Sequence, residues 1–181
     1  FVVHTMKGNS WIFTAGHVCR PPLGTLESRI AVVSGGQTYV QVELVHIAEA
    51  VDLCVLLLMG KELPQVTLSP TAPKHGDQAY ALAAPFGIYE EGLIPQFSGY
   101  YSGVATNVPE PANVSTRLPK LDTYTIPSRP GSSGGPIFNS KRELVGMIVM
   151  AHPAFETFTL ASPYSALRLA IDVITGRYKG Q

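Results

Sequence analysis

Short apolar or alternating runs separated by turn residues make up most of the chain. Each run has the length of a strand, and glycine and proline are scattered between the runs instead of being concentrated in one place. The candidate strands span residues 11–14, 30–33, 39–45, 53–58, 78–83, 103–106, 136–138 and 143–150. Many short strands with frequent turn signals predict an all-β barrel or sandwich.

The end of the chain has a helical period and predicts one helix. Ser162 can cap this helix, Pro163 suits its first position, and Gly176 can close it. Its apolar face follows the i, i+3, i+4, i+7 spacing with Leu167, Ala170, Ile171 and Ile174. We expect this helix to follow the last strand.

A proline-containing stretch around Pro64 and residues 70–73 lies between two of the candidate strands. We expect it to separate two β units. The N-terminal unit would comprise residues 1–70, and the C-terminal unit would comprise residues 71–181 with the helix.

Composition narrows the class of protein. Apolar residues make up 45% of the 181 residues and charged residues 14%, which indicates a packed globular chain and not a disordered one. Thirteen basic and thirteen acidic residues cancel, and they form no basic stripe, so we expect neither a nucleic-acid partner nor an anionic membrane surface. The longest apolar run, residues 53–59, is too short for a membrane span.

The ends of the chain and its cysteines bear on cellular context. The chain begins with an apolar segment, without an initiator Met or a signal peptide, which we interpret as a mature product or a domain cut from a longer protein. The chain has two cysteines, Cys19 and Cys54. They could form one disulfide or remain two buried thiols, and the sequence does not decide between these alternatives. The location therefore stays open beyond a soluble one.

A first chemical motif is Phe13-Thr14-Ala15-Gly16-His17-Val18, where an apolar run ends in small residues and presents a histidine. The small residues allow a tight turn beside a cleft, where an imidazole can shuttle protons near neutral pH. Taken alone, a histidine of this kind is more often structural or exposed.

A second motif places Asp52 at the head of the apolar run 53–58. A carboxylate beside so much apolar surface needs a strong partner, because burying it unpaired is costly. Taken alone, a solvated turn aspartate is the more common interpretation.

The third motif, Pro130-Gly131-Ser132-Ser133-Gly134-Gly135-Pro136, is the most specific. Gly131 allows a turn in which its own N–H and that of Ser133 point to one spot, and such a pair forms an oxyanion hole. Gly134 and Gly135 leave room for a substrate chain to approach the Ser133 hydroxyl. An ordinary glycine–serine loop is the alternative, which the short loop between two apolar segments disfavours.

Taken in the order His17, Asp52, Ser133, the motifs resemble those of the chymotrypsin-like serine peptidases, namely Thr-Ala-x-His, Asp-Leu-x-x-Leu and Gly-x-Ser-Gly-Gly-Pro. The loop around Ser133 is most similar to that of the HtrA-type and compact viral branches. The resemblance covers most of the chain, from Trp11 to the final helix. It implies two antiparallel six-stranded β-barrels with a C-terminal α-helix and a site between the barrels.

The resemblance also implies an activity, that of a serine endopeptidase. Ser133 would be the nucleophile, His17 the general base and Asp52 the residue that orients it, while the amides of Gly131 and Ser133 would hold the oxyanion. The substrate would be a polypeptide, processed through an acyl-enzyme. We expect no cofactor and no metal, because His4, His46 and His75 lack metal-like spacing to cysteine or acidic residues.

Two departures from the family pattern change the expectations. Ser132 stands where zymogen-type members carry an aspartate that pairs with a newly cut N-terminus, so we expect activity without such a salt bridge. Val18 stands between His17 and Cys19, whereas many members have a cysteine directly after the histidine. The disulfide partner of Cys19 is therefore not given by the family pattern.

By family alignment, the pocket for the residue before the scissile bond (P1) would involve residues 127–130, 149–151 and 157–160. The substrate-binding candidates are Pro127, Ser128, Val149, Met150 and Ala151. Residues 127–130 carry no acidic side chain, so we expect a small or apolar P1 residue. Residues 149–151 could also pair with the substrate backbone. His152 either touches substrate or is an exposed loop histidine.

Other readings compete with this one. An α/β-hydrolase also uses G-x-S-x-G but needs the order Ser, acid, His, which this chain does not have. Asp77 and Asp122 could be mistaken for the acidic partner, yet neither heads an apolar strand at the family's place. An inactive homologue that only binds peptides would keep the fold. Two contexts fit an active enzyme, a viral polyprotein-processing protease domain and the catalytic domain of an HtrA-type quality-control protease. The viral context would place the protein in the host cytoplasm.

Overall fold

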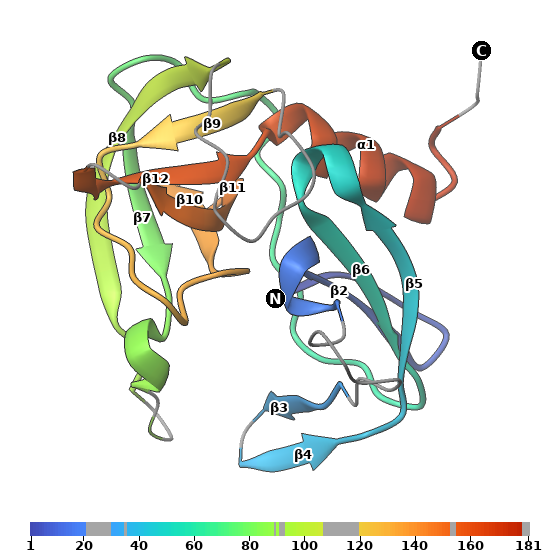
Figure 1. Ribbon diagram of the computed structural model, residues 1–181. Helices are drawn as coiled ribbons and strands as arrows, with labels where there is room; N and C mark the ends of the chain where they lie inside the picture. Colours follow the sequence, from blue (N-terminus) through green and yellow to red (C-terminus); the bar gives the residue numbers. More distant parts are fainter. Residues whose placement is uncertain are drawn as a thin grey trace.

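The N-terminal strands of the computed structural model form an open sheet (Figure 1). The structure describes residues 1–20, 30–34, 36–88, 90, 93–106, 120–152 and 155–178. Four strands pair in the order β1-β2-β6-β5, and β3 pairs with β4 in a separate hairpin. The bounds are β1 Val2–Met6, β2 Asn9–Ala15, β3 Val32–Ser34, β4 Gln37–Tyr39, β5 Val42–Ala48 and β6 Leu53–Leu58.

The C-terminal strands close into an antiparallel barrel in the order β10-β11-β12-β9-β8-β7. Their bounds are β7 Gln78–Leu82, β8 Gln96–Ala105, β9 Leu121–Tyr124, β10 Pro136–Asn139, β11 Leu144–His152 and β12 Phe155–Ser162. Ala79 and Ala81 point into the barrel, and their small side chains leave room for Tyr101 and Tyr124. The two tyrosine rings meet edge to face with centroids 5.2 Å apart.

An all-β fold with one C-terminal helix is confirmed, and so is a closed six-stranded barrel in the second half. The expected N-terminal six-stranded barrel is not seen among the described residues. Six strands are present there, but the short strands β3 and β4 pair with each other and not with the four-stranded sheet.

Four strands were not predicted from the sequence, namely β1, β4, β9 and β12. The candidate strand 39–45 shares only Tyr39 with β4 and corresponds to β5. β9 and β12 carry buried polar side chains, Asp122, Thr123 and Thr159, at positions where an apolar residue would signal a strand. The Thr159 hydroxyl, for example, donates a 2.6 Å hydrogen bond to the carbonyl oxygen of Ile126. Internal partners of this kind make burial of polar side chains possible, and they cannot be seen in a local pattern.

The one α-helix among the described residues, α1 (Tyr164–Ile174), packs its predicted apolar face between the two halves. Leu167 and Ile171 are buried against Phe13 of β2 and Leu144 and Met147 of β11. The predicted cap was wrong, because Ser162 belongs to β12 and the residue before the helix is Pro163.

A long-range cap holds the helix start instead. The Asp122 carboxylate on β9 accepts a 2.9 Å hydrogen bond from the backbone N–H of Tyr164. A negative group also suits the positive end of the helix dipole.

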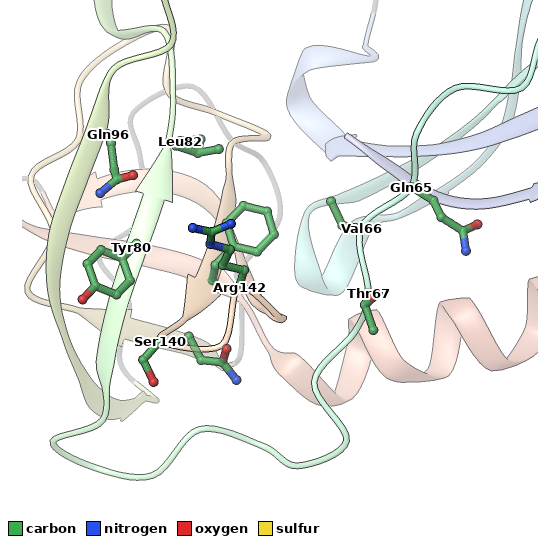
Figure 2. A pocket seen from close by; sticks show the side chains of 10 residues that line it. Gln65, Val66, Thr67, Tyr80, Leu82, Gln96, Ser140 and Arg142 are labelled. Carbon is green, nitrogen blue, oxygen red and sulfur yellow. The ribbon is translucent and has the colours of Figure 1, made fainter.

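The connection between the two halves borders a hollow beside the barrel (Figure 2). The hollow measures about 670 Å³ and lies between Gln65, Val66 and Thr67 of the connection and Tyr80 and Leu82 of β7. Neither His17 nor Asp52 nor Ser133 lines it. The chemistry suggested by the sequence therefore lies elsewhere.

Candidate active site

Strand pairing brings the His17 and Asp52 segments together. β2 ends at Ala15 and a 3₁₀ turn, Gly16–Val18, carries His17, while Asp52 immediately precedes β6. Ala15 pairs with Leu53, so the two strand ends lie side by side. The N–H of Gly16 donates a 2.7 Å hydrogen bond to the Asp52 carbonyl, which ties the turn to the start of β6.

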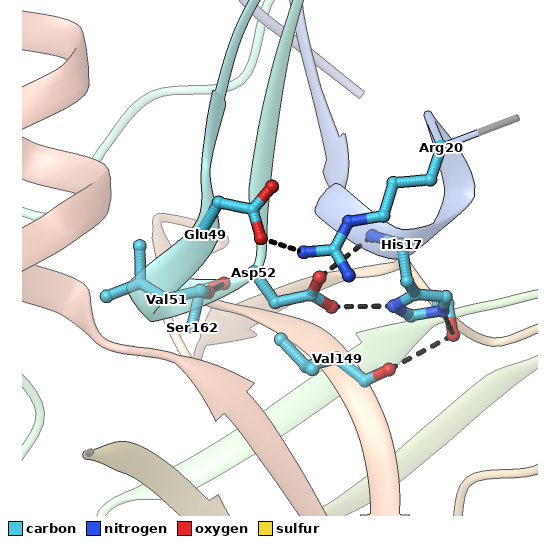
Figure 3. Close-up of polar contacts among 8 residues, drawn as sticks. His17, Arg20, Glu49, Val51, Asp52, Val149 and Ser162 are labelled. Carbon is cyan, nitrogen blue, oxygen red and sulfur yellow. Dashed lines mark hydrogen bonds and ion pairs between the residues drawn. The ribbon is translucent and has the colours of Figure 1, made fainter. Parts of the chain in front are cut away.

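Both Asp52 carboxylate oxygens contact His17 (Figure 3). Oδ2 lies 2.6 Å from the ring Nδ1, and Oδ1 accepts a 2.8 Å hydrogen bond from the backbone N–H. Asp52 is only 4% exposed, so these hydrogen bonds replace lost water. Because a carboxylate can only accept here, Nδ1 carries the proton, and in the neutral ring Nε2 is left free to accept.

Ser133, in the C-terminal half of the chain, contacts the other ring nitrogen of His17. Its Oγ lies 3.0 Å from His17 Nε2 and 3.1 Å from the carbonyl oxygen of Val149, to which it donates. One hydroxyl proton therefore has two acceptors, and a small rotation directs it to the imidazole. The His17 side chain is 37% exposed, so the reacting side of the ring is open to a ligand.

A close approach of the two halves positions Ser133. Gly134, the next residue, has φ +82°, and a Cβ there would lie 2.2 Å from Thr14 Oγ1 at the end of β2. The N–H of Gly134 also donates a 2.8 Å hydrogen bond to the carbonyl of Ile148 on β11. Any larger residue at this position would push Ser133 away from His17.

The peptide before Gly131 is oriented by a segment that the sequence did not single out. The N–H of Phe86, in the 3₁₀ turn Pro85–Gly87, donates a 2.6 Å hydrogen bond to the Pro130 carbonyl. In a trans peptide the next N–H points the opposite way, so that of Gly131 is directed away from Phe86. Within the described residues, the N–H groups of Gly131 and Ser133 have no backbone acceptor.

The predicted substrate-binding residues occupy two segments. Val149, Met150 and Ala151 lie on β11, and the Val149 carbonyl accepts a hydrogen bond from Ser133. Pro127 is exposed, whereas Ser128 is 3% exposed and its hydroxyl has no hydrogen-bond partner among the described residues. Their binding of substrate remains a prediction.

Residues 157–160, the third part of the predicted pocket, lie on β12 opposite β11. Leu160 pairs with Met150 and Thr159 with Ala151. His152 ends β11, and its ring centroid lies 5.6 Å from that of Phe155. A role for these residues in substrate contact likewise remains a prediction.

Cys19 and Cys54 form a disulfide, which settles the alternative that the sequence left open. Each cysteine lies two residues after a member of the site, His17 in one case and Asp52 in the other. The bond therefore joins the two segments that carry the imidazole and the carboxylate.

Asp122, which the sequence set aside, lies away from this site in a buried cluster. It is 4% exposed and accepts hydrogen bonds from the Tyr101 hydroxyl (3.2 Å) and the Tyr164 N–H. Burial raises the pKa of Asp122 above its usual value even though both hydrogen bonds act in the opposite direction. Burial and the nearby carboxylate raise the pKa of Tyr101 to about 12, so this hydroxyl stays a donor.

Two further findings concern metal binding and membrane spans among the described residues. They contain no group of three or more His, Cys, Asp and Glu side chains placed to hold a metal ion. No helix in the described part of the chain is long and apolar enough to cross a membrane.

A β-barrel joined to a β-sheet, with hydroxyl, imidazole and carboxylate aligned between them, is the arrangement of a chymotrypsin-like serine peptidase domain. The family model of the trypsin-like peptidase domain matches residues 1–147. The chain belongs to this family.

Curated relatives point to one branch. A probable periplasmic DegP-like serine endoprotease of Pseudomonas putida is 27% identical over 169 residues, covering 93% of this chain and 31% of the relative. The corresponding protein of Halomonas elongata is 28% identical over 166 residues, covering 91% and 31%. The chain thus spans about a third of the length of these relatives.

Solved structures share the fold. The HtrA-type protease AlgW with a decapeptide superposes with a TM-score of 0.72 at 21% identity, covering 96% of this chain and 50% of that one. The active form of the Rv3671c protease from M. tuberculosis gives 0.73 at 17% identity, covering 94% and 70%. The curated relatives are bacterial and DegP-like, so they support the HtrA-type interpretation of the sequence. They give no support to the viral interpretation or to a location in the host cytoplasm.

Proposed function

We propose that this domain is a serine endopeptidase in which Ser133, His17 and Asp52 act as a catalytic triad. One observation carries the proposal, namely the unbroken line of contacts from Asp52 Oδ2 to His17 Nδ1 (2.6 Å) and from His17 Nε2 to Ser133 Oγ (3.0 Å). Asp52 and His17 belong to the N-terminal unit, residues 1–70, and Ser133 to the C-terminal unit, residues 71–181. Both units would thus be needed for activity.

The proposed reaction begins when Ser133 Oγ attacks a peptide carbonyl and its proton passes to His17 Nε2. Asp52 stabilises the imidazolium through the proton on Nδ1. Collapse of the tetrahedral intermediate breaks the C–N bond, and His17 gives its proton to the leaving amine. Water then attacks the acyl-enzyme by the same route, which frees the acid and restores the Ser133 hydroxyl.

The oxyanion would be held by the N–H groups of Gly131 and Ser133. The hydrogen bond from Phe86 to the Pro130 carbonyl supports this role, because it keeps the Gly131 N–H directed away from the barrel. Donors that are fixed before the reaction stabilise a developing charge without further reorganisation.

The substrate backbone would pair with Val149, Met150 and Ala151, with Pro127 and Ser128 beside the P1 side chain. The contact between Ser133 Oγ and the Val149 carbonyl supports this placement. Since residues 127–130 carry no carboxylate, we expect a small or apolar P1 residue.

The biological context that we infer is of the HtrA type and outside the cytoplasm. The named relatives are DegP-like and periplasmic. The disulfide between Cys19 and Cys54 supports an oxidising compartment, where such bonds persist.

A serine-directed fluorophosphonate and a peptide library test the proposal together. Wild type should be labelled on Ser133, located by mass spectrometry, and should cleave the library after a restricted set of residues. Ser133→Ala should lose both, while Ser140→Ala, a serine in the turn between β10 and β11, should keep both. Asp52→Asn should lower kcat by about 10⁴-fold, because it favours the wrong tautomer of His17.

An inactive peptide-binding homologue predicts different results. It would take up no label at Ser133, and Ser133→Ala would bind peptides like the wild type. Either finding would remove the hydrolytic proposal.

A further inference from the structure

A small apolar pocket lies beside Ser133 and is separate from the predicted P1 pocket. It measures about 220 Å³, and no charged side chain lines it. Its walls are the nucleophile loop, residues 131–135, and the segments before and after the β7–β8 connection, with Leu82, Ala83, Ala84, Ile94 and Pro95. Because Ser133 itself is part of the wall, whatever enters this pocket lies against the residue that carries the reacting hydroxyl.

The nucleophile loop lies between two neighbours, which fixes the side on which the pocket sits. On one side is β11, held by the contacts of Gly134 with Ile148 and of Ser133 with Val149. On the other side is the end of β7, where a Cβ on Gly131 would come within 2.6 Å of the Ala84 carbonyl. The pocket belongs to this second side.

A substrate whose acyl part pairs with β11 must leave Ser133 toward the opposite side. We propose that the pocket beside Ala84 and Ile94 binds the apolar side chain of the residue that follows the scissile bond (P1′). This inference rests on the proposed function and adds a specificity that the triad alone does not give.

The β7–β8 connection, which borders the pocket, also exposes apolar side chains. It exposes four large apolar side chains, Phe86 (69%), Ile88 (51%), Leu93 (47%) and Ile94 (56%). Such a cluster on a surface usually marks a binding site. Ile94 belongs both to the cluster and to the pocket, so the apolar surface is continuous with the wall that contains Ser133.

Charge adds a second preference. In sequence, residues 83–95 include Glu90 and Glu91 and no basic residue. An acidic residue just after the scissile bond would meet a pocket wall that has no charged side chain to pair with it. We therefore expect apolar residues to be favoured there and acidic residues to be rejected.

The pocket is formed before any ligand arrives. The Ala83 N–H donates to the Pro95 carbonyl at 3.2 Å and joins the two ends of the connection. The Phe86 N–H holds the Pro130 carbonyl at 2.6 Å, which joins the connection to the nucleophile loop. A preformed wall costs less ordering free energy on binding, so a single apolar side chain can contribute measurably.

Acyl transfer measures this side of the site directly. An ester with the best acyl group from the library forms the acyl-enzyme, and an added amino-acid amide competes with water for it. The amine nitrogen attacks the acyl carbon, the bond to Ser133 Oγ breaks, and the amine proton returns to Oγ through His17. The ratio of amide product to acid product reports how well the acceptor side chain fits.

We expect leucinamide to capture the acyl-enzyme about 10-fold more efficiently than glycinamide, the order of effect of one apolar side chain in a pocket. The α-amide of aspartate should capture it less well than glycinamide. Ile94→Asn should remove most of the leucinamide advantage. Leu169→Asn, at a similarly exposed apolar position on α1 (49%), should leave it unchanged.

The possible failures can be told apart. Equal capture of leucinamide and glycinamide, or an advantage that survives Ile94→Asn, overturns the P1′ proposal alone, provided that an ester burst and Ser133 labelling are observed. If no acyl-enzyme forms at all, the proposed peptidase function is wrong, and the P1′ proposal, which rests on it, is wrong as well.

Discussion

The Ser162 hydroxyl on β12 donates a 2.7 Å hydrogen bond to the carbonyl oxygen of Val51, the residue before Asp52. The two partners are 111 residues apart, so the bond ties the C-terminal half to the turn that presents the carboxylate. Asp52 itself adopts a left-handed conformation (φ 49°), which an aspartate holds only where its surroundings fix it. Ser162 therefore acts on Asp52 through the backbone of Val51, and we expect it to be a positioning residue.

Ser162→Ala should lower kcat by about 10-fold while KM changes little, because a small displacement of Asp52 misorients His17. Ser162→Thr, which keeps the hydroxyl, should restore most of kcat. Steady-state kinetics with one peptide substrate measures both.

A matched control separates positioning from packing. Ser10 is equally buried (0%), and its hydroxyl donates a 2.8 Å hydrogen bond to the Lys61 carbonyl and accepts a 2.9 Å hydrogen bond from the Leu63 N–H. Ser10 pairs with Leu58, at the opposite end of the β2–β6 ladder from the residues beside Asp52. Ser10→Ala removes both hydrogen bonds and should lower stability by about 1–3 kcal/mol, while kcat stays near the wild-type value. If both alanine variants lose kcat equally, Ser162 has no special role.

The disulfide gives a second prediction. It closes a loop of 35 residues between Cys19 and Cys54, and chain-entropy arguments assign such a loop about 3–4 kcal/mol of stability. Reduction of the wild type should therefore lower the unfolding free energy by this order. Urea unfolding with and without reductant measures the change.

The double variant Cys19→Ala/Cys54→Ala is the control for this experiment. It should unfold at the same urea concentration with and without reductant. The prediction would be contradicted if the urea midpoint of the wild type were the same with and without reductant. Activity should fall alongside stability, because the bond joins the His17 and Asp52 segments.

Local sequence motifs were sufficient to predict the three residues of the candidate triad. His17, Asp52 and Ser133 each stand in a short motif, and the structure brings the three side chains into contact. The helix was also predictable, since an amphipathic period is a local property.

Contacts made across the fold were not predictable from the sequence. Ser162 was expected to cap α1, but it donates to Val51, and Asp122 accepts the N–H at the start of the helix. Phe86 carries no motif, because its contribution comes from a backbone N–H. Such roles depend on which segments meet in three dimensions and not on residue type.

Gly131 provides a test of the proposed oxyanion hole. It has φ +94°, and a Cβ would lie 2.6 Å from the Ala84 carbonyl, so Gly131→Ala must shift the peptide that carries its N–H. We expect kcat to fall by about 10²–10³-fold, the usual cost of losing one oxyanion donor. Rapid-quench kinetics of acylation measures this step.

Gly76→Ala is the matched control, since Gly76 also has a positive φ (+86°) but no atom within 4 Å of an added Cβ. It shares the backbone strain, about 1–2 kcal/mol, without the clash, and it lies in a turn outside the site. It should lose stability and keep its acylation rate. Comparable losses of acylation in both variants would assign the effect of Gly131→Ala to strain.

Asp122 makes stability depend on pH. Burial raises its pKa in the folded protein above the ordinary value of 3.8, so the folded state binds this proton more tightly than the unfolded chain. As pH rises from about 3.8 through the folded pKa, the unfolding free energy should fall, and above that pKa the loss is complete. Asp122→Asn keeps an oxygen that can accept from the Tyr164 N–H but cannot ionise.

The difference in unfolding free energy, variant minus wild type, should therefore move in favour of Asp122→Asn across this pH window and then stay constant. Urea unfolding at a series of pH values measures it. Asp77→Asn removes another negative charge, from an exposed turn where Asp77 accepts a 2.8 Å hydrogen bond from the Lys74 N–H, and should not reproduce the trend. Parallel curves for wild type and Asp122→Asn would show that ionising Asp122 costs the folded state nothing, and that its two hydrogen bonds compensate fully for burial.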